Sequence, residues 1–350
     1  MPGPSIRFQS VLRSSMPHLP ERSPLVIVVS HLDELTRREP VALTLGTFDG
    51  VHRGHRRIIE RTVAVARDAG IPSVLMTFDP HPREVIGRQG DPTYLLTSID
   101  ERMTLLDGLE LDACVVLPFT RDLSVLDAET FFEEYLLRRL NASHIVVGVD
   151  HAFGKGRSGS APELQRLGQK HGIDISVVSQ LLVEGIKVSS TTIRNALLSG
   201  AIRQANLFLG RPYALRGIVV RGDGVGSTLG FPTANIELTD DNKLLPRSGV
   251  YIVAVGFDGN RHYGIMNIGR RPTLSKQMHI SVEVHIFITS GNLYGQSMQI
   301  ALLDRLRDEI RFENREQLIG QIQTDIAFAK ERIPKLETDY NNEQFSFFKE

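Results

Sequence analysis

The chain has 350 residues, 41% of them hydrophobic and 23% charged, which is typical of a globular protein with room for two domains. The formal net charge is −1, so no overall basic field would recruit nucleic acid, and anionic substrates must be held by local sites. No apolar stretch approaches the length of a membrane span, and the single cysteine, Cys114, excludes an internal disulfide. We therefore expect a cytoplasmic protein that binds neither nucleic acid nor a membrane.

Residues 1–23 hold several serines, prolines and arginines, with Glu21 as the only acidic residue. This composition is loosely like that of a transit peptide, but the prolines oppose an amphipathic helix and there is no apolar core for secretion. We expect a disordered extension or a start site assigned too early. The last ten residues, 341–350, are expected to form a tail.

Short apolar runs alternate with helical patterns from Leu25 to about Val183. This alternation predicts an α/β domain with a Rossmann-like parallel sheet covered on both faces, which binds ligands beyond the carboxyl ends of its strands. The expected strands are 26–29, 41–45, 74–78, 114–117, 145–149 and 175–182, and the expected helices include 55–69 and 128–140.

From about Arg211, apolar runs follow one another without helices between them, which favours an antiparallel β-barrel. Asp258-Gly259 is a hairpin signal inside this region. The expected strands are 217–221, 250–257, 263–268 and 280–288. The last of them alternates strictly, with Ile280, Val282, Val284, Ile286 and Ile288 on one face and Glu283 and His285 on the other.

A long helix is expected near the C-terminus, because Asn314 and Gln317 have capping-box spacing. Its apolar stripe, which would pack on the barrel, contains Ile319, Ile322, Ile326, Ala329 and Ile333. These patterns divide the chain into a first domain at 24–200, a linker at 201–210 and a second domain at 211–340.

Residues 46–55 read Gly-Thr-Phe-Asp-Gly-Val-His-Arg-Gly-His and join an apolar run to a helical pattern. Glycines let the backbone approach a ligand closely, and a helix N-terminus presents unpaired N–H groups and a partial positive charge. His52 and His55 add donors where a polyphosphate would lie. The segment predicts a phosphate site for a nucleotide.

Two other interpretations of this segment are weaker. His-x-x-His could belong to a zinc site, but no third ligand is near in sequence and the glutamate of His-Glu-x-x-His is missing. A purely structural turn would not need two histidines at a helix entrance.

Three further loops carry polar residues that have either a structural or a binding interpretation. His81 stands between two prolines and is either a surface turn residue or a presented ligand contact. Asp150 leads into a glycine-rich loop that is not a P-loop. Ser190 is either an N-cap with Arg194 solvated nearby, or both residues meet phosphate.

The first half resembles the nucleotidylyltransferase superfamily through His-x-Gly-His at 52–55, and within it the FAD synthetases. The closer likeness comes from Phe-Asp-Pro-His-Pro at 78–82, Val-Gly-x-Asp at 147–150 and Ser-Ser-Thr-x-Ile-Arg at 189–194. The resemblance implies attack of the FMN phosphate on the α-phosphorus of ATP, with Mg²⁺ present and pyrophosphate leaving. It implies catalytic roles for His52, His55 and Arg194, ATP contacts at Gly46, Phe48, Asp49, Gly54, Ser190 and Thr191, and flavin contacts at His81 and Asp150.

The second half resembles the riboflavin kinases in the order of its motifs. These are Leu-Gly-Arg-Pro-Tyr at 209–213, Gly-Phe-Pro-Thr-Ala-Asn at 230–235, Gly-Val-Tyr at 249–251, Asn-Ile-Gly-Arg-Arg-Pro-Thr at 267–273, Glu-Val-His at 283–285, Leu-Tyr-Gly at 293–295 and Leu-Arg-Asp-Glu-Ile-Arg-Phe at 306–312. Taken alone, Glu283 would be an ordinary solvated strand residue, and 221–227 fails as a Rossmann fingerprint. With the first half, the resemblance covers about residues 25–335 and is to the bifunctional bacterial riboflavin kinase/FMN adenylyltransferases.

The kinase resemblance implies that Glu283 accepts the proton of the riboflavin 5′-hydroxyl. It implies that Thr233 and Asn235 hold Mg²⁺ and the ATP phosphates. Gly222 and Gly224 would then lie near phosphate, and Arg307 would contact flavin.

Four residues depart from the family pattern. His151 stands where phenylalanine is usual and Lys187 where arginine is expected, on the adenylyl-transfer side. On the kinase side, Ser227 replaces an arginine and Asn292 an aspartate, which could lower kinase activity without abolishing the fold.

We interpret the chain as an enzyme acting on riboflavin, FMN and ATP, as a monomer or weak homo-oligomer. One rival is a nucleotidylyltransferase with another acceptor, against which the whole second half argues. A non-enzymatic rival is that one half serves as a flavin-binding or regulatory module.

Overall fold

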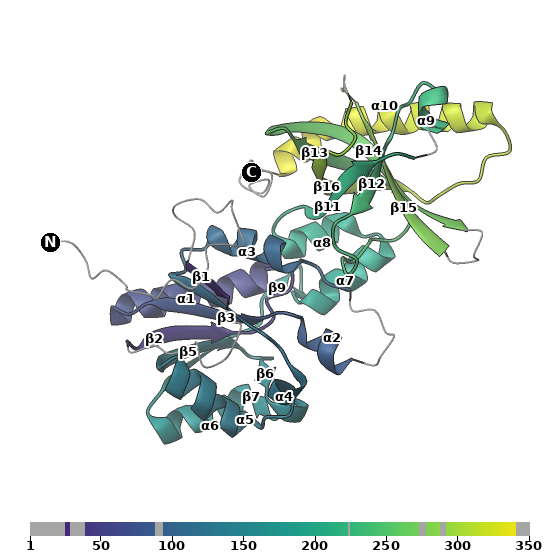
Figure 1. Ribbon diagram of the computed structural model, residues 1–350. Helices are drawn as coiled ribbons and strands as arrows, with labels where there is room; N and C mark the ends of the chain where they lie inside the picture. Colours follow the sequence, from purple (N-terminus) through teal and green to yellow (C-terminus); the bar gives the residue numbers. More distant parts are fainter. Residues whose placement is uncertain are drawn as a thin grey trace. The chain divides into compact units, whose positions relative to one another are not determined.

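The computed structural model describes residues 25–28, 39–87, 94–222, 225–272, 278–287 and 292–340. The chain forms two compact units, and it passes between them more than once (Figure 1). The first unit takes its residues from within 1–48, 56–91 and 103–179, and the second from within 49–55, 92–102 and 180–350. The expected extension at 1–23 and tail at 341–350 lie outside the described residues, as does Gly224.

The first unit contains a six-stranded parallel sheet in the order β1-β4-β3-β2-β5-β8. Its strands are β1 (Leu25–Val28), β2 (Val41–Leu45), β3 (Ser73–Phe78), β4 (Ala113–Leu117), β5 (Ala142–Gly148) and β8 (Asp174–Val178). These strands are mostly apolar runs, as expected for a parallel sheet that is covered on both faces. The predicted parallel α/β sheet is confirmed.

Helices cover both faces of this sheet. One face packs on α4 (Arg121–Ser124), α5 (Ala128–Phe131), its π-helical continuation (Phe132–Arg139) and α6 (Ala161–His171). The other face packs on α1 (Arg53–Ala69), through Val65 and Ala66. Between β2 and β5 the chain order reverses, and ligand sites of parallel sheets form beyond the strand ends at such a reversal.

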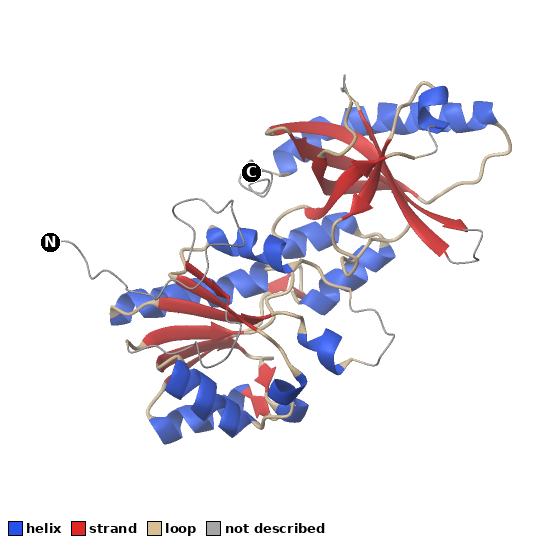
Figure 2. Cartoon of the chain, in the orientation of Figure 1, coloured by secondary structure: helices blue, strands red, loops and turns tan. Residues whose placement is uncertain are grey.

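The second unit contains a closed antiparallel barrel, whose strands are among those drawn in red in Figure 2. The strand order is β11-β12-β15-β14-β13-β16. Its strands are β11 (Tyr213–Val220), β12 (Ala234–Leu238), β13 (Gly249–Phe257), β14 (Asn260–Pro272), β15 (Met278–Ile286) and β16 (Ser297–Arg307). Asp258 and Gly259 form the predicted hairpin turn, with φ of 50° and 67°. Val282, Val284 and Ile286 are buried as the alternation predicts, whereas Ile280 is 41% exposed.

Residues 201–210, expected as a linker, form a buried helix instead. Helix α8 (Ile202–Leu209) follows α7 (Ser190–Ser199), and both belong to the unit of the barrel. Ile202, Phe208 and Leu209 are fully or almost fully buried in the same core as the barrel interior. The apolar residues of this segment recur at helical spacing, so the helix buries one face. The change of composition near residue 200 had suggested a linker instead.

The predicted C-terminal helix is α10 (Arg315–Asp339), capped by Asn314, whose side chain accepts from the N–H of Gln317 at 2.9 Å. Ala329 and Ile333 are buried in a cluster with Ile252 and Leu303 of the barrel, as expected.

Strands β12 and β16 were not predicted. None of the helices that the structure describes is long and apolar enough to cross a membrane.

Candidate active sites

The glycine-rich turn leaves the carboxyl end of β2 with a strained backbone. The N–H of Gly46 still bonds the Met76 carbonyl, at 3.0 Å, and then φ becomes positive at Phe48 (47°), Gly50 (88°) and Val51 (38°). A positive φ is unusual for phenylalanine and a clear outlier for β-branched valine. Strain of this kind persists only where surrounding contacts fix the backbone, and it concentrates at functional sites.

The side chain of Asp49 fixes this turn through hydrogen bonds to other residues of the second unit. Its carboxylate is 1% exposed and accepts from the N–H groups of Leu96 (2.9 Å) and Thr97 (3.0 Å), from the Thr97 hydroxyl, and from Arg194. Its carbonyl accepts from the Ser190 hydroxyl at 2.9 Å. Because so many donors converge on one buried carboxylate, Asp49 fixes the backbone of the turn, and its expected contact with ATP stays a prediction.

His52 and His55 stack on each other at the start of α1. Their ring centroids are 3.6 Å apart with 15° between the planes. Nδ1 of His52 accepts from the N–H of His55 at 3.2 Å, so a neutral His52 carries its proton on Nε2, where it can donate to a phosphate oxygen. Gly54 lies beside the same ring, since a Cβ there would be 3.2 Å from it.

Both imidazoles are neutral at pH 7. Burial lowers the pKa of His52 to about 4, and the positive charges of Arg211 and Arg194 add to this effect although Asp49 opposes it. Burial also lowers the pKa of His55 well below its usual value, with further contributions from His52 and Arg102. The pair therefore offers N–H donors rather than cations in the ligand-free protein.

Helix α7 brings Arg194 and Ser190 to the turn. The N-cap of this helix is Ser189, which accepts from the N–H of Thr192 at 3.1 Å, so the hydroxyl of Ser190 is left to bond Asp49. Arg194 is not solvated on the surface, because Nε also donates to the Tyr94 carbonyl at 3.0 Å. Thr191, expected to contact ATP, is exposed on the first turn of α7.

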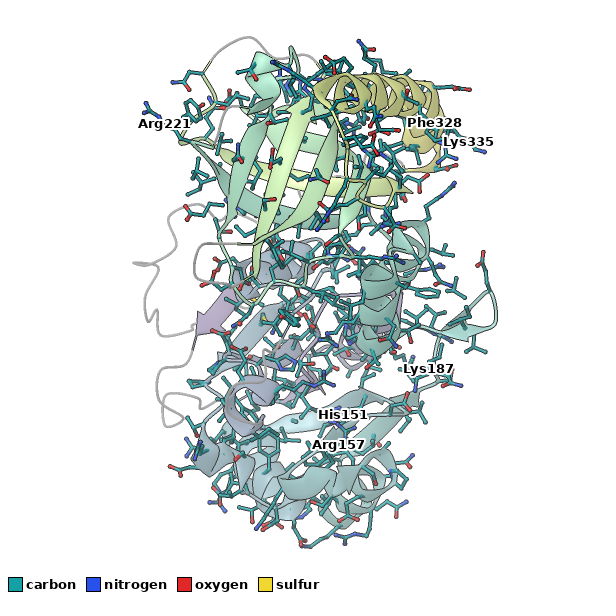
Figure 3. All side chains as sticks on the ribbon, turned by 90° about the vertical axis from the view of Figure 1, so that its right-hand side faces the viewer. His151, Arg157, Lys187, Arg221, Phe328 and Lys335 are labelled. Atoms are coloured by element: carbon teal, nitrogen blue, oxygen red, sulfur yellow. The ribbon has the colours of Figure 1, made fainter. Side chains whose placement is uncertain are left out.

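The expected flavin contacts lie at strand ends of the first unit. His81 is 6% exposed and caps α2 (Pro82–Ile86), accepting from the N–H of Arg83 through Nδ1 at 3.1 Å. Asp150 is exposed directly after β5. His151 packs against Phe153, with 5.7 Å between the ring centroids. Burial lowers the pKa of His151 to about 4, and the charge of Arg157 adds to this effect. Figure 3 labels His151 and Arg157.

A second polar cluster lies on the barrel around Glu283. In the strand register Glu283 is directly opposite Asn235 on β12 and Asn267 on β14, so the three side chains share one face. Gly222 gives this cluster room, because a Cβ there would be 2.1 Å from Asn235 Nδ2. Thr233 directly precedes β12, and Nδ1 of His285 bonds the carbonyl of Pro232, the residue before Thr233, at 2.9 Å.

Comparison with known proteins places both regions of the chain in one family. A family model described as FAD synthetase matches residues 35–192, and one described as riboflavin kinase matches residues 209–333. The chain is 36% identical to the bifunctional riboflavin kinase/FMN adenylyltransferase of Escherichia coli K12 over 84% of its length and 93% of that protein. It is 34% identical to the protein of the same name from Bacillus subtilis, over 85% of its length and 95% of the relative.

The chain belongs to the bifunctional riboflavin kinase/FMN adenylyltransferase family. A solved structure from Streptococcus pneumoniae, titled a macrolide-efflux protein, has the same architecture, with a TM-score of 0.81 and 30% identity over 87% of this chain and 99% of that one. The predicted family membership and fold class are confirmed, and ATP is the co-substrate that such kinases and adenylyltransferases use.

The oxygen donors around Glu283 suit the Mg²⁺ that the kinase resemblance implies. The Thr233 hydroxyl, the Asn235 amide oxygen and the Glu283 carboxylate are hard ligands, and Mg²⁺ in such enzymes is held by few protein groups together with substrate phosphates. No group of three or more histidine, cysteine or acidic side chains gathers as a metal cage in the described part of the chain. The three side chains near Glu283 are of the ligand type that Mg²⁺ prefers.

Arg307, the expected flavin contact of the barrel, is engaged in an ion pair. Nε and Nη2 bond the carboxylate of Asp325 on α10 at 2.7–3.0 Å, and Nη1 bonds the Asp308 carbonyl at 2.9 Å.

Arg221, labelled in Figure 3, follows β11. Its guanidinium carbon lies over the ring of Tyr294, 5.8 Å from the ring centroid.

Sequence reasoning missed the residues that support the turn. Arg211 and Lys243 are 7% and 6% exposed, and both reach the turn or the segment that carries it. Arg211 was part of a family motif with no role attached, and Lys243 is one charge in a polar stretch. Only their burial distinguishes Arg211 and Lys243 from the other basic residues, and burial of a basic residue cannot be read from the sequence.

Proposed function

We propose that this chain phosphorylates riboflavin to FMN and then adenylylates FMN to FAD, both with ATP. Residues 24–200 would carry the adenylyl transfer and residues 211–340 the kinase reaction. The observation that supports this most directly is the presence of two distinct polar sites, the stacked histidines and the Glu283 cluster, within regions that match the two family models in this order.

In the adenylyl transfer, a phosphate oxygen of FMN forms a bond to the α-phosphorus of ATP while the bond to pyrophosphate breaks. No covalent enzyme intermediate is needed, so the residues align two anions and stabilise the leaving group. Nε2 of His52, the His55 ring and Arg194 would donate to the phosphates. Residues on the nucleotide side would be Gly46, Phe48, Asp49, Gly54, Ser190 and Thr191, and those on the flavin side would be His81 and Asp150.

In the kinase reaction, Glu283 would accept the proton of the riboflavin 5′-hydroxyl as that oxygen bonds the γ-phosphorus of ATP, while the bond from the γ-phosphorus to the β–γ bridging oxygen breaks and ADP leaves. Mg²⁺ held by Thr233 and Asn235 would neutralise phosphate charge. Gly222 and Gly224 would admit the phosphates close to the backbone. Arg307, oriented by Asp325, would contact the flavin. We also propose a cytoplasmic monomer or weak homo-oligomer.

The two activities should separate by single substitutions in the full chain. Glu283→Ala is expected to stop FMN formation from riboflavin while supplied FMN is still converted to FAD, and His55→Ala should do the reverse. Chromatography of FMN and FAD after incubation with ATP and Mg²⁺ measures both reactions. Loss of both activities in either folded variant would refute this division of labour.

A further inference from the structure

The segment that supports the adenylyl-transfer turn is bonded on its other side to the barrel loop before β13. Leu95 donates its N–H to the Asn242 carbonyl at 2.7 Å and accepts from the N–H of Leu244 at 2.8 Å. The next residues, Leu96 and Thr97, donate to Asp49. The short stretch 95–97 is therefore held by the barrel loop and in turn holds the turn.

Lys243 reinforces this connection with a buried charge. Its ammonium donates to the Leu96 carbonyl at 2.8 Å and to the carboxylate of Glu101, and it lies 4.9 Å from the ring centroid of Tyr213 on β11. Tyr213 bonds the Leu244 carbonyl at 2.7 Å, which keeps the same loop in place. A buried ammonium is tolerated only with such compensation, so this arrangement strongly constrains the position of segment 95–101.

Arg211 reaches the turn itself. Nη2 of Arg211 donates to the Gly50 carbonyl at 2.8 Å. Gly50 lies between Phe48 and Val51, the two non-glycine residues of the turn with positive φ. Arg211 is 7% exposed and directly precedes β11. Both basic residues lie within the riboflavin kinase match and beyond the FAD synthetase match, which ends at residue 192.

We propose that Arg211 and Lys243, two residues of the kinase half, are positioning residues for adenylyl transfer. Arg211 sets the backbone of the turn at Gly50, and Lys243 holds the segment that anchors Asp49. This inference rests on the proposed assignment of adenylyl transfer to the turn. It implies that FAD formation depends on the barrel even when FMN is supplied and no kinase chemistry occurs.

Arg211→Met and Lys243→Met in the full chain test the inference, with riboflavin phosphorylation and FMN adenylylation measured separately. Each variant is expected to lower kcat/KM for FAD formation by about 100-fold, the cost of misplacing reacting groups by roughly 1 Å. Riboflavin phosphorylation should stay within about twofold of the unaltered chain, the scatter expected of a change that leaves its transition state untouched. Arg211→Lys, which keeps one donor for Gly50, should retain more FAD formation than Arg211→Met.

Arg332→Met is the matched control, because Arg332 pairs with Asp304 of the barrel at 2.8 Å and touches neither site. It should leave the ratio of the two activities unchanged. If Lys243→Met does not fold, Arg211→Met still decides, since it removes one hydrogen bond to the turn.

A parallel fall of both activities in Arg211→Met, or FAD formation at the unaltered rate, would overturn the inference alone. If the unaltered chain formed FMN but no FAD, the proposed function itself would fail.

Discussion

The turn at 49–55 and the barrel cluster around Glu283 are both candidate phosphate sites, but they are stabilised in different ways. The turn depends on a buried carboxylate, with Asp49 and Arg194 joined across 145 residues of sequence. The barrel cluster depends on strand register, which places Asn235 and Asn267 on either side of Glu283. A change in one ion pair should therefore disturb the turn, whereas the barrel cluster should tolerate side-chain changes that leave the backbone ladder intact.

The largest effect is expected from Asp49→Asn, which leaves the buried Arg194 without its carboxylate. Breaking a buried pair on one side costs about 3–5 kcal/mol of unfolding free energy. FAD formation should fall as well, and urea unfolding with the FMN assay measures both. Asp325→Asn is the control, because it breaks a comparably buried pair with Arg307 far along the chain. Equal FAD formation by the two folded variants would contradict the role given to Asp49.

The next effect is a pH dependence that comes from the turn. The pKa of His52 is about 4 in the folded chain and 6.5 in the unfolded chain, so between these values only the unfolded chain takes up the proton. Stability should therefore fall as the pH drops from 6.5 to 4, by about 3 kcal/mol from this residue. His52→Gln should flatten that part of the profile in urea unfolding at several pH values. An unchanged slope would show that His52 titrates normally.

Gly50→Ala is expected to cost about 2 kcal/mol, because φ is 88° and the added Cβ would meet Leu96 Cδ1 at 2.9 Å. Gly259→Ala in the barrel hairpin is the matched control, since φ is 67° there but no atom lies within 4 Å. Thermal unfolding should show the smaller loss for Gly259→Ala. Equal losses would mean that the space around Gly50 contributes nothing.

The smallest effect is expected on the barrel side. Thr233→Val removes one proposed ligand of Mg²⁺ and phosphate, and should raise the KM for ATP in riboflavin phosphorylation about tenfold, or about 1.4 kcal/mol. FAD formation from supplied FMN should not change. Thr239→Val, just beyond the other end of β12, serves as the control. A larger loss of FAD formation than of FMN formation would reverse the assignment of the two sites.

The sequence predicted the sheet and much of the barrel because their strands carry continuous or alternating apolar residues. It also predicted that His52 and His55 lie at a helix start, because an apolar helical pattern follows them directly in the sequence. It could not predict what holds them, because Leu96, Arg194 and Arg211 approach Asp49 or Gly50 only through the tertiary fold. Helix α8 is not predicted, because the composition changes near residue 200 as it does at a domain boundary.

The stacked, neutral imidazoles of His52 and His55 have a further consequence for ligand capture. A polyanion placed against them raises their proton affinity, since the nearby negative charge favours imidazolium. Between about pH 5 and 6.5, where an ordinary histidine is at least half protonated but these two are still neutral, nucleotide capture should thus draw protons from the buffer. Calorimetry in buffers of different ionisation enthalpy would count those protons, and the heat of association would change from buffer to buffer in proportion.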